Sequence, residues 1–343
     1  MHAKKIIGIL ALIMYPLSGL SHHSVAANFD QTITVEIEGT ITGIYWQNPH
    51  VLFTLTPTDE NRGTEWSLET HSLSIMKRMD VSEPFVQIGD EIKAAGWPAR
   101  QGQGLFVNNM LLPAGKEFVF RFGAEPAELR WSDQLWGTNE RWFAESGDSS
   151  AEERGIFRVW STTLAGGKGF FWLPEYPLTE EAIARKDTFN ALTDNPLLDC
   201  ALKGMPTIMS APYPIEFIDR GKTIELRIEE YDLVRTIHMD GQTITNPEHS
   251  LLGYSTGRWD NQTLIVETNA SNWGYFRGTG EYPLSEDSEF IERFSPTDNG
   301  SRLQYELTVI DPTVFTEPLV LVKSWIWLPD VTIDPYDCIS QYP

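Results

Sequence analysis

The chain has 343 residues, with 26 lysines and arginines against 48 aspartates and glutamates, and a formal net charge of −22 at pH 7. The acidic residues are interspersed rather than gathered in one tract, and this sign of charge argues against nucleic acid or anionic membranes as partners. Twelve tryptophans and a hydrophobic content of 41% exclude a disordered chain. The length favours two domains.

The first residues carry the pattern of a secretory signal. Two lysines form a positively charged start, and residues 6–20 are almost wholly apolar, which is too short for a membrane span of about 20 apolar residues. We expect a signal peptide over residues 1–21 with cleavage before His22; the alternative is cleavage after Ala27. No later segment is apolar enough to span a membrane. Because of the signal, the sequence predicts an exported protein of the periplasm or extracellular space.

Cys200 and Cys338 are the two cysteines of the chain. An even number of cysteines in an oxidising compartment predicts a disulfide, which here would tie the C-terminal tail to the middle of the chain. The alternative is a pair of buried reduced thiols.

Residues 22–112 have the rhythm of a small β-barrel. Apolar residues alternate with period two, the strand pattern, over residues 33–37, 41–46, 51–55, 66–68, 91–95 and 105–112. One short helix is expected at residues 72–79. Five or six strands and one helix in this length favour an OB-like barrel, and a β-sandwich is the alternative.

The segment 113–195 lacks the alternating pattern of the first domain and is predicted to connect two domains. Trp131, Trp136 and Trp142 have helical spacing, and Thr179, followed by two glutamates, is a good helix start. We expect that helix to run to about residue 192. So many tryptophans indicate a segment packed on the next domain rather than a flexible linker.

Residues 196–343 are predicted to form a larger antiparallel β-meander. Eight strands are expected, joined mostly by short turns rich in Asp, Asn and Gly, at residues 216–218, 223–228, 233–239, 251–259, 262–268, 289–294, 303–310 and 319–328. Closure into a barrel would remove the exposed edges, and such a barrel can hold one small apolar ligand.

The histidines of the first domain are the strongest indication of a chemical site. A mature chain that begins at His22 offers a metal two nitrogens, the free amine and a ring nitrogen, and copper(II) favours nitrogen-rich sites. Our hypothesis is a copper-type site built from the histidines of the first domain, His22, His23, His50 and His71. The alternatives are a frayed N-terminal end and a turn histidine bonded to its own backbone.

Two further sets of residues invite a chemical interpretation. Acids and bases gather on neighbouring predicted strands and would suit a hydrolase if they converged on one cleft, namely Glu225, Glu229, Glu230, Asp232, Arg235, His238 and Asp240. Ser255 lies between Gly253 and Gly257, but without the strand-to-helix context of a nucleophile, so we expect a β-bulge there.

Short motifs run in order through residues 21–112: His22-His23-Ser24, Phe29-Asp30, Trp46-x-Asn48-Pro49-His50, Trp66-x-Leu68-Glu69 and Gly89-Asp90. Together they resemble a family of exported bacterial proteins of unknown function whose mature chains begin with His-His-Ser and Phe-Asp. The last region is similar to a second uncharacterised exported type, through Gly204-Met205-Pro206, Pro212-Tyr213-Pro214 and residues 253–259. It departs from that pattern at Asp260-Asn261-Gln262, where a Glu-Gly-Asp turn is expected. The resemblance implies export and a two-part architecture, and no activity.

We therefore expect an exported, mainly β protein of two barrel-like domains joined by a helical, tryptophan-rich segment. The leading hypothesis is a non-catalytic binding protein, with a copper-type site in the first domain and a small apolar ligand in the second. The second hypothesis is an enzyme, either copper-dependent and oxidase-like or an acid/base hydrolase. The third is an interaction module of the cell envelope.

Overall fold

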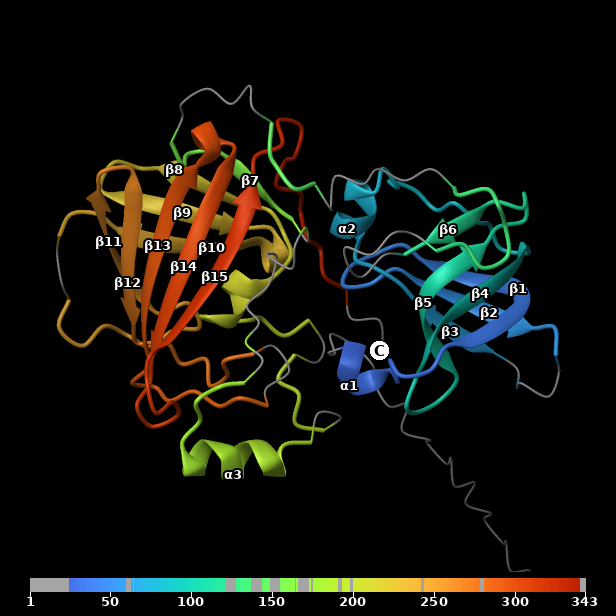
Figure 1. Ribbon diagram of the computed structural model, residues 1–343, viewed down its shortest axis with the longest axis horizontal. Coiled ribbons are helices and arrows are strands. Elements are labelled where there is room, and N and C mark those ends of the chain that lie inside the picture. The colour runs from blue at the N-terminus through green and yellow to red at the C-terminus, as the bar shows by residue number, and fades with distance from the viewer. Residues whose placement is uncertain are drawn as a thin grey trace, which may run out of the picture.

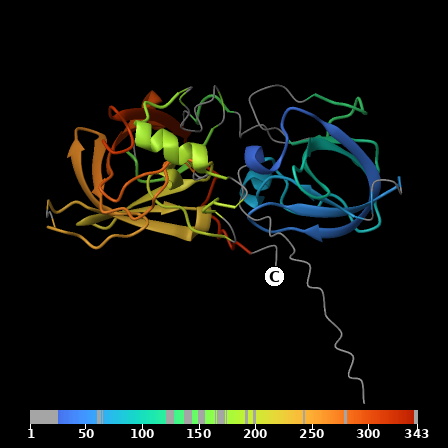
Figure 2. The same ribbon diagram turned by 90° about the horizontal axis from the view of Figure 1, so that it is seen from below.

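Two β-barrels lie side by side in the computed structural model (Figure 1). The structure describes residues 25–59, 63, 65–120, 128–136, 144–148, 155–163, 165, 173, 175–190, 193–197, 200–241, 244–277 and 281–339. The view from below shows helix α3 lying across one end of the second barrel (Figure 2). No helix of the described residues is long and apolar enough to cross a membrane.

The first barrel is the OB-like one expected from the alternating residues. Its strands are β1 (Val35–Tyr45), β2 (Leu52–Pro57), β3 (Trp66–Glu69), β4 (Glu91–Pro98), β5 (Gly104–Leu111) and β6 (Glu117–Val119). Antiparallel neighbours follow the order β3-β2-β1-β4-β5, and parallel pairing of β3 with β5 closes the ring. The predicted helix is α2 (Leu73–Arg78), capped by the Ser72 hydroxyl. Closure excludes the alternative, a two-layer sandwich.

β1 is one continuous strand where the sequence predicts two separated by Gly39. The register with β2 shifts between Ile41 and Gly43 instead. Gly39 permits the close approach of β2, because a Cβ atom there would lie 2.1 Å from the Thr56 carbonyl oxygen. The glycine therefore marks a tight strand contact rather than a strand end.

The second barrel contains all eight predicted strands and a ninth that the sequence did not reveal. They are β7 (Val159–Thr162), β8 (Ile215–Asp219), β9 (Thr223–Ile228), β10 (Leu233–His238), β11 (Tyr254–Asp260), β12 (Thr263–Asn269), β13 (Glu289–Thr297), β14 (Arg302–Ile310) and β15 (Leu319–Ile326). Within the described residues these nine close in the order β10-β11-β12-β13-β14-β15-β7-β8-β9. All neighbours are antiparallel except β10 and β11, which run parallel over two residue pairs.

The middle of the chain contributes one strand to each barrel. β6 lies beyond the expected boundary at residue 112 and pairs with β5, while β7 fills the gap between β15 and β8. Trp131 and Trp136 lie in an irregular segment instead of the expected helix, because the buried Glu117 carboxylate accepts the three consecutive backbone N–H groups of residues 130–132 at 2.9–3.1 Å. Trp142 is outside the described residues.

α3 (Glu180–Thr188) begins where the sequence predicts and ends earlier. The Thr179 hydroxyl accepts the backbone N–H of Ala182 at 3.2 Å, as a capping residue should. Ala182 is buried in the core of the second barrel. The helix therefore covers the end of the barrel that is lowest in Figure 1.

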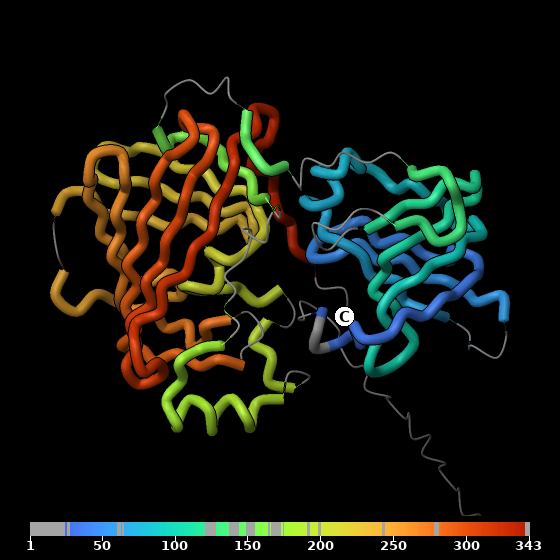
Figure 3. Tube along the Cα trace, in the orientation of Figure 1, coloured from blue at the N-terminus to red at the C-terminus, as the bar shows by residue number. Residues whose placement is uncertain are grey.

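The predicted disulfide between Cys200 and Cys338 is present. The chain after β15 leaves the second barrel and runs to the first, as the red segment of Figure 3 shows. The two cysteines are 138 residues apart in the sequence. The disulfide therefore anchors this C-terminal tail to the segment that precedes β8.

Candidate functional site

His50 is held by a hydrogen bond that determines which of its ring nitrogens can bind a metal. Its Nδ1 lies 2.9 Å from the Thr70 carbonyl oxygen and 3.4 Å from Glu69 Oε1. Because a carbonyl only accepts, Nδ1 carries a hydrogen in this contact, and in the neutral ring the lone pair is then on Nε2. Histidines that bind metals are commonly held by a carbonyl or carboxylate in this way. The side chain is 22% exposed.

His71 is a core residue with 4% of its surface exposed. Its ring centroid lies 6.5 Å from that of Phe106 and 6.1 Å from that of Phe120. The ring therefore forms part of the apolar wall near His50.

The ring of Phe106 contacts the start of the described chain and lies close to His50 and His71. Its centroid is 5.4 Å from the ring of Phe29 and 6.3 Å from that of His50. Phe29 follows α1 (Val25–Asn28) directly, and its N–H donates to the Val25 carbonyl at 2.9 Å. The chain thus enters the first barrel next to His50 and His71.

His22 and His23 lie outside the described residues. Among the residues that are described, no group of three or more His, Cys, Asp or Glu is placed to hold a metal ion. The four-histidine site therefore stays a prediction, for which the described part of the chain contributes His50 and His71.

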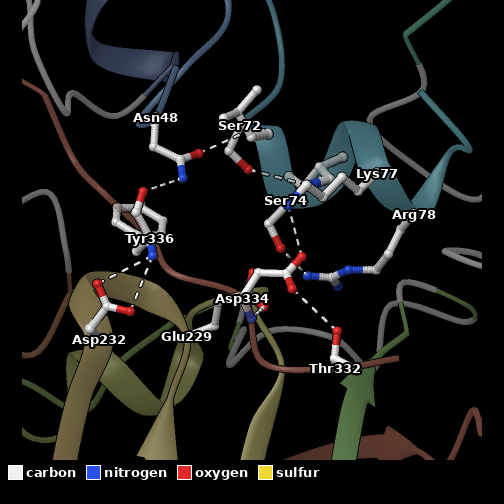
Figure 4. A network of polar contacts seen from close by, with 12 residues as sticks. Asn48, Ser72, Ser74, Lys77, Arg78, Glu229, Asp232, Thr332, Asp334 and Tyr336 are labelled. Carbon is white, nitrogen blue, oxygen red and sulfur yellow. Dashed lines mark hydrogen bonds and ion pairs between the residues drawn. The ribbon is translucent and has the colours of Figure 1, made fainter. Parts of the chain in front are cut away.

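Asn48, in the same motif as His50, joins the first barrel to the C-terminal tail (Figure 4). Its buried amide donates from Nδ2 to the Tyr336 carbonyl at 2.5 Å and accepts at Oδ1 from the Leu73 N–H at 3.0 Å. Its backbone carbonyl accepts from Ile339 N–H at 3.2 Å. One asparagine thus binds the tail on two atoms and the start of α2 on a third.

The second barrel holds the other side of the tail (Figure 4). The Asp232 carboxylate accepts the Tyr336 N–H at 3.1 and 3.2 Å, and Glu229 accepts the Asp334 N–H at 3.2 Å. Glu229 directly precedes the short helix η5 (Glu230–Asp232) between β9 and β10, and Asp232 is the last residue of this helix. The tail is therefore clamped between the barrels by backbone hydrogen bonds.

Opposite charges meet across this interface. Arg78 of α2 is buried and donates to the Pro212 carbonyl at 3.2 Å and to the Ser74 hydroxyl at 2.8 Å. Burial lowers the pKa of Arg78 to about 10 although the Glu229 carboxylate opposes the change. Burial likewise raises the pKa of Glu229, with Arg78 opposing. These charges support the contact between the barrels.

The acids and bases that suggested a hydrolase do not converge on one cleft. Glu225 pairs with Arg220 on the outer surface at 2.8 Å, and Glu230 pairs with Lys203 at 2.5 Å. His238 stacks on Tyr254 with ring centroids 4.8 Å apart. With Glu229 and Asp232 bound to the tail, these groups serve separate structural contacts.

Arg235 forms a buried ion pair inside the second barrel with a residue that the sequence analysis missed. Its guanidinium binds both oxygens of Glu292, and the two residues are 1% and 0% exposed. Tyr305 donates to Glu292 Oε1 at 2.7 Å, and burial next to this carboxylate raises the pKa of Tyr305 well above its usual value. The signal in the sequence was alternation, since Glu292 falls on the same strand face as Phe290 and Phe294.

Ser255 belongs to the same network, and the predicted β-bulge around it is wrong. β11 pairs with β12 in continuous register from Tyr254 to Asp260. The Ser255 hydroxyl accepts Arg235 Nε at 3.0 Å and lies 3.0 Å from the Thr268 hydroxyl. It therefore helps to satisfy the buried guanidinium.

Comparison with known proteins gives a family match for the first region and no activity. Residues 11–107 match the model of a family of unknown function (DUF6152), which confirms the expected resemblance of the first region to a family of unknown function. No curated protein matches the chain, and no solved structure matches it either.

Proposed function

We propose that this protein is exported and binds copper(II) at the edge of the first barrel, with His22 as the mature N-terminus. The free amine and ring of His22 supply two nitrogens and His50 Nε2 supplies a third. A deprotonated amide of His23 can complete the nitrogen-rich, tetragonal arrangement that copper(II) prefers. His71 lines the apolar wall beside His50.

The observation that carries this proposal is the setting of His50. Its Nδ1–H is engaged by the Thr70 carbonyl with Glu69 close by, which orients the other nitrogen for a metal. Three residue steps separate His22 from Val25, where α1 begins, and an extended chain covers at most about 3.3–3.6 Å per residue. Because the rings of Phe29 and His50 both lie against the ring of Phe106, the segment that follows His22 enters the barrel near His50, which supports a site shared by the two histidines.

Two further properties support export and cation binding. The disulfide between Cys200 and Cys338 suits an oxidising compartment. The net charge of −22 raises the local concentration of cations around the protein.

Native mass spectrometry of the exported protein, with and without copper(II), tests the proposal. We expect a mature mass that begins at His22 and retains one copper. His22→Ala and His50→Ala should each weaken copper retention by at least about tenfold, or 1.4 kcal/mol. His249→Ala removes an exposed histidine of the second barrel and is the matched control.

Three results would contradict the proposal. They are a mature chain that begins at Asn28, a chain from His22 that retains no copper, and copper retention that His50→Ala leaves unchanged.

A further inference from the structure

We propose that the second barrel binds an extended, uncharged peptide in an opening of its wall, where β10 and β11 separate. β10 pairs with β9 over six residue pairs, but it pairs with β11 over only two, Ile237 with Ser255 and His238 with Thr256. Among the described residues, the first part of β10, residues 233–236, therefore has a neighbouring strand on one side only. We call the opening beside these residues the β10 slot.

The hydrogen-bond register with β9 determines which backbone groups of β10 face this slot. The Met239 N–H donates to the Lys222 carbonyl at 2.8 Å, in line with the ladder between the two strands. In an antiparallel ladder, residues that bond to one neighbour alternate with residues whose backbone groups face the opposite side. The odd-numbered residues of β10 therefore bond to β9, and the backbone groups of its even-numbered residues face the slot.

Three backbone groups of β10 remain available in the slot. Parallel pairing of Ile237 with Ser255 uses the groups on either side of Ile237, the Thr236 carbonyl and the His238 N–H. The Val234 N–H, the Val234 carbonyl and the Thr236 N–H have no hydrogen-bond partner among the described residues. Two donors and one acceptor thus line this edge with the spacing of a strand.

The chain that precedes β11 turns away and leaves the slot open. The Gly253 N–H donates to the Ser250 carbonyl at 3.2 Å, and the Ser250 N–H donates to the Ala270 carbonyl at 3.1 Å. These bonds hold residues 250–253 in a turn beside the end of β12. A cavity of about 400 Å³ lies between this turn and β10. The slot is therefore the place where a further stretch of strand would continue the barrel wall.

The edge of β10 lacks the features that usually protect an unpaired strand. Such edges commonly carry lysine or proline, which discourage pairing with another chain. Here Val234 is 49% exposed and Thr236 is exposed as well, and both are β-branched residues of high strand propensity. An extended chain can therefore pair with this edge through its own backbone.

The lining of the slot selects an uncharged chain. The lining residues include no acid, and the Arg235 guanidinium is neutralised by its ion pair with Glu292. The His238 ring stacks on Tyr254, and Leu252 adds an apolar wall. A charged side chain that pointed into this cavity would lose its hydration without gaining a counterion, which costs free energy.

The three backbone groups distinguish a peptide from a small apolar ligand. An extended peptide can accept from both N–H groups and donate to the Val234 carbonyl, as in other cases of strand addition. A purely apolar molecule would desolvate these groups without replacing their hydrogen bonds. The geometry thus favours an extended segment of another protein, with β-branched or apolar side chains.

The β10 slot is independent of the proposed copper site. It lies on the second barrel and shares no side chain with His50 or its partners Thr70 and Glu69. Failure of one proposal therefore leaves the other testable.

The probe is the peptide Thr-Val-Thr-Val-Thr-Val with blocked ends, titrated into the full mature protein by calorimetry. We expect saturable binding, and we expect it to slow hydrogen exchange of the Val234 and Thr236 amides at least about tenfold, which corresponds to 1.4 kcal/mol. Exchange is measured with single-residue resolution, with and without the peptide. The same peptide with glutamate in place of valine should bind more weakly.

Val234→Pro separates the backbone contribution from folding. It removes an N–H that faces the slot and none that bonds to β9, and proline is tolerated at such edge positions. We expect it to weaken peptide binding at least about tenfold, or 1.4 kcal/mol, whereas Val234→Ala keeps the N–H and should weaken binding less. Val320→Ala truncates a valine of β15 that is exposed to a similar degree, 53%, and is the matched control.

The proposal is overturned if the valine peptide does not bind at millimolar concentration, or if it binds without slowing exchange at Val234 and Thr236. It is also overturned if Val234→Pro, with an unchanged melting temperature, binds as the wild type does. A dimer in which both amides are already protected without peptide would show that a second copy occupies the slot and equally overturn it.

Discussion

The two barrels fill their interiors with different chemistry. The core of the first barrel contains residues such as Ile41, Phe53 and Leu68, none with any exposed surface, and its buried Glu117 carboxylate binds backbone N–H groups rather than a charged partner. Inside the second, the Arg235–Glu292 pair is buried together with Tyr305 among residues such as Phe294 and Trp325. The difference follows from size, because a barrel of nine strands encloses more volume than one of five and needs longer side chains to fill it.

A charged interior is stable only when every polar group has a partner. Arg235 reaches Glu292, Ser255 and Thr268, and Glu292 also accepts from Tyr305. Such a network adds specificity, since only the native register brings all its members together. The apolar interior of the first barrel tolerates conservative exchanges better.

Removing one member of the buried pair should have the largest effect. We expect Arg235→Met to lower the free energy of unfolding by about 3–5 kcal/mol, because Glu292 is left buried without its counterion. The double variant Arg235→Met with Glu292→Leu should recover most of this loss. Urea denaturation measures both, and equal losses in the single and double variants would show that the pair is not the cause.

Removing the disulfide should cost somewhat less. We expect Cys200→Ser with Cys338→Ser to lower the free energy of unfolding by about 2–4 kcal/mol, because the unfolded chain gains freedom. The wild type measured in a reducing agent should match the variant. If the variant were as stable as the oxidised wild type, the hydrogen bonds of the tail would hold it in place without the disulfide.

Asn48 tests how firmly the tail couples the two barrels. Asn48→Ala should cost about 1–3 kcal/mol, because buried groups of the tail and of α2 lose their partners, and should speed hydrogen exchange at residues 334–339. Lys77→Ala is the control, since its ion pair with Asp334 is 46% and 39% exposed and should contribute at most about 1 kcal/mol. Equal effects of the two variants would contradict the role assigned to Asn48.

The smallest effect concerns pH and the β14–β15 connection of the second barrel. Burial would raise the pKa of Asp311, but hydrogen bonds from Ser285, Thr313 and Ser288 outweigh it and hold the pKa below its usual value of 3.8. Since the folded pKa is depressed, the stabilisation is present above about pH 3.8 and is lost as the pH falls through the folded value. We expect Asp311→Asn to lose about 1 kcal/mol at pH 7 and to show a weaker acid dependence than the wild type. Denaturation curves of both proteins from pH 2 to 7 measure this difference. If the variant showed the same acid dependence as the wild type, this assignment would be contradicted.

Period-two alternation was enough to locate eight strands of the second barrel, and the capping Thr179 with the two glutamates after it located the start of α3. The short helix α2 was also expected from the sequence of residues 72–79. These elements depend on local spacing and on capping groups. Two cysteines in a chain with a predicted signal were enough for the disulfide. The alternation also contained the position of Glu292, which shares a face with Phe290 and Phe294, although the pairing with Arg235 is 57 residues away in sequence.

Other features depended on contacts between distant segments. β6 and β7 are only three and four residues long, so they carry too little pattern to be recognised until a barrel edge pairs with them. The irregular path around Trp131 arises because Glu117 binds three backbone amides there. Local sequence therefore determined where strands form and which face is buried, whereas tertiary structure decided how the rings close, which charges meet inside them and that Asn48 binds the tail. The physical reason is that alternation is encoded by neighbouring residues, while closure and charge pairing require groups that meet only in the folded chain.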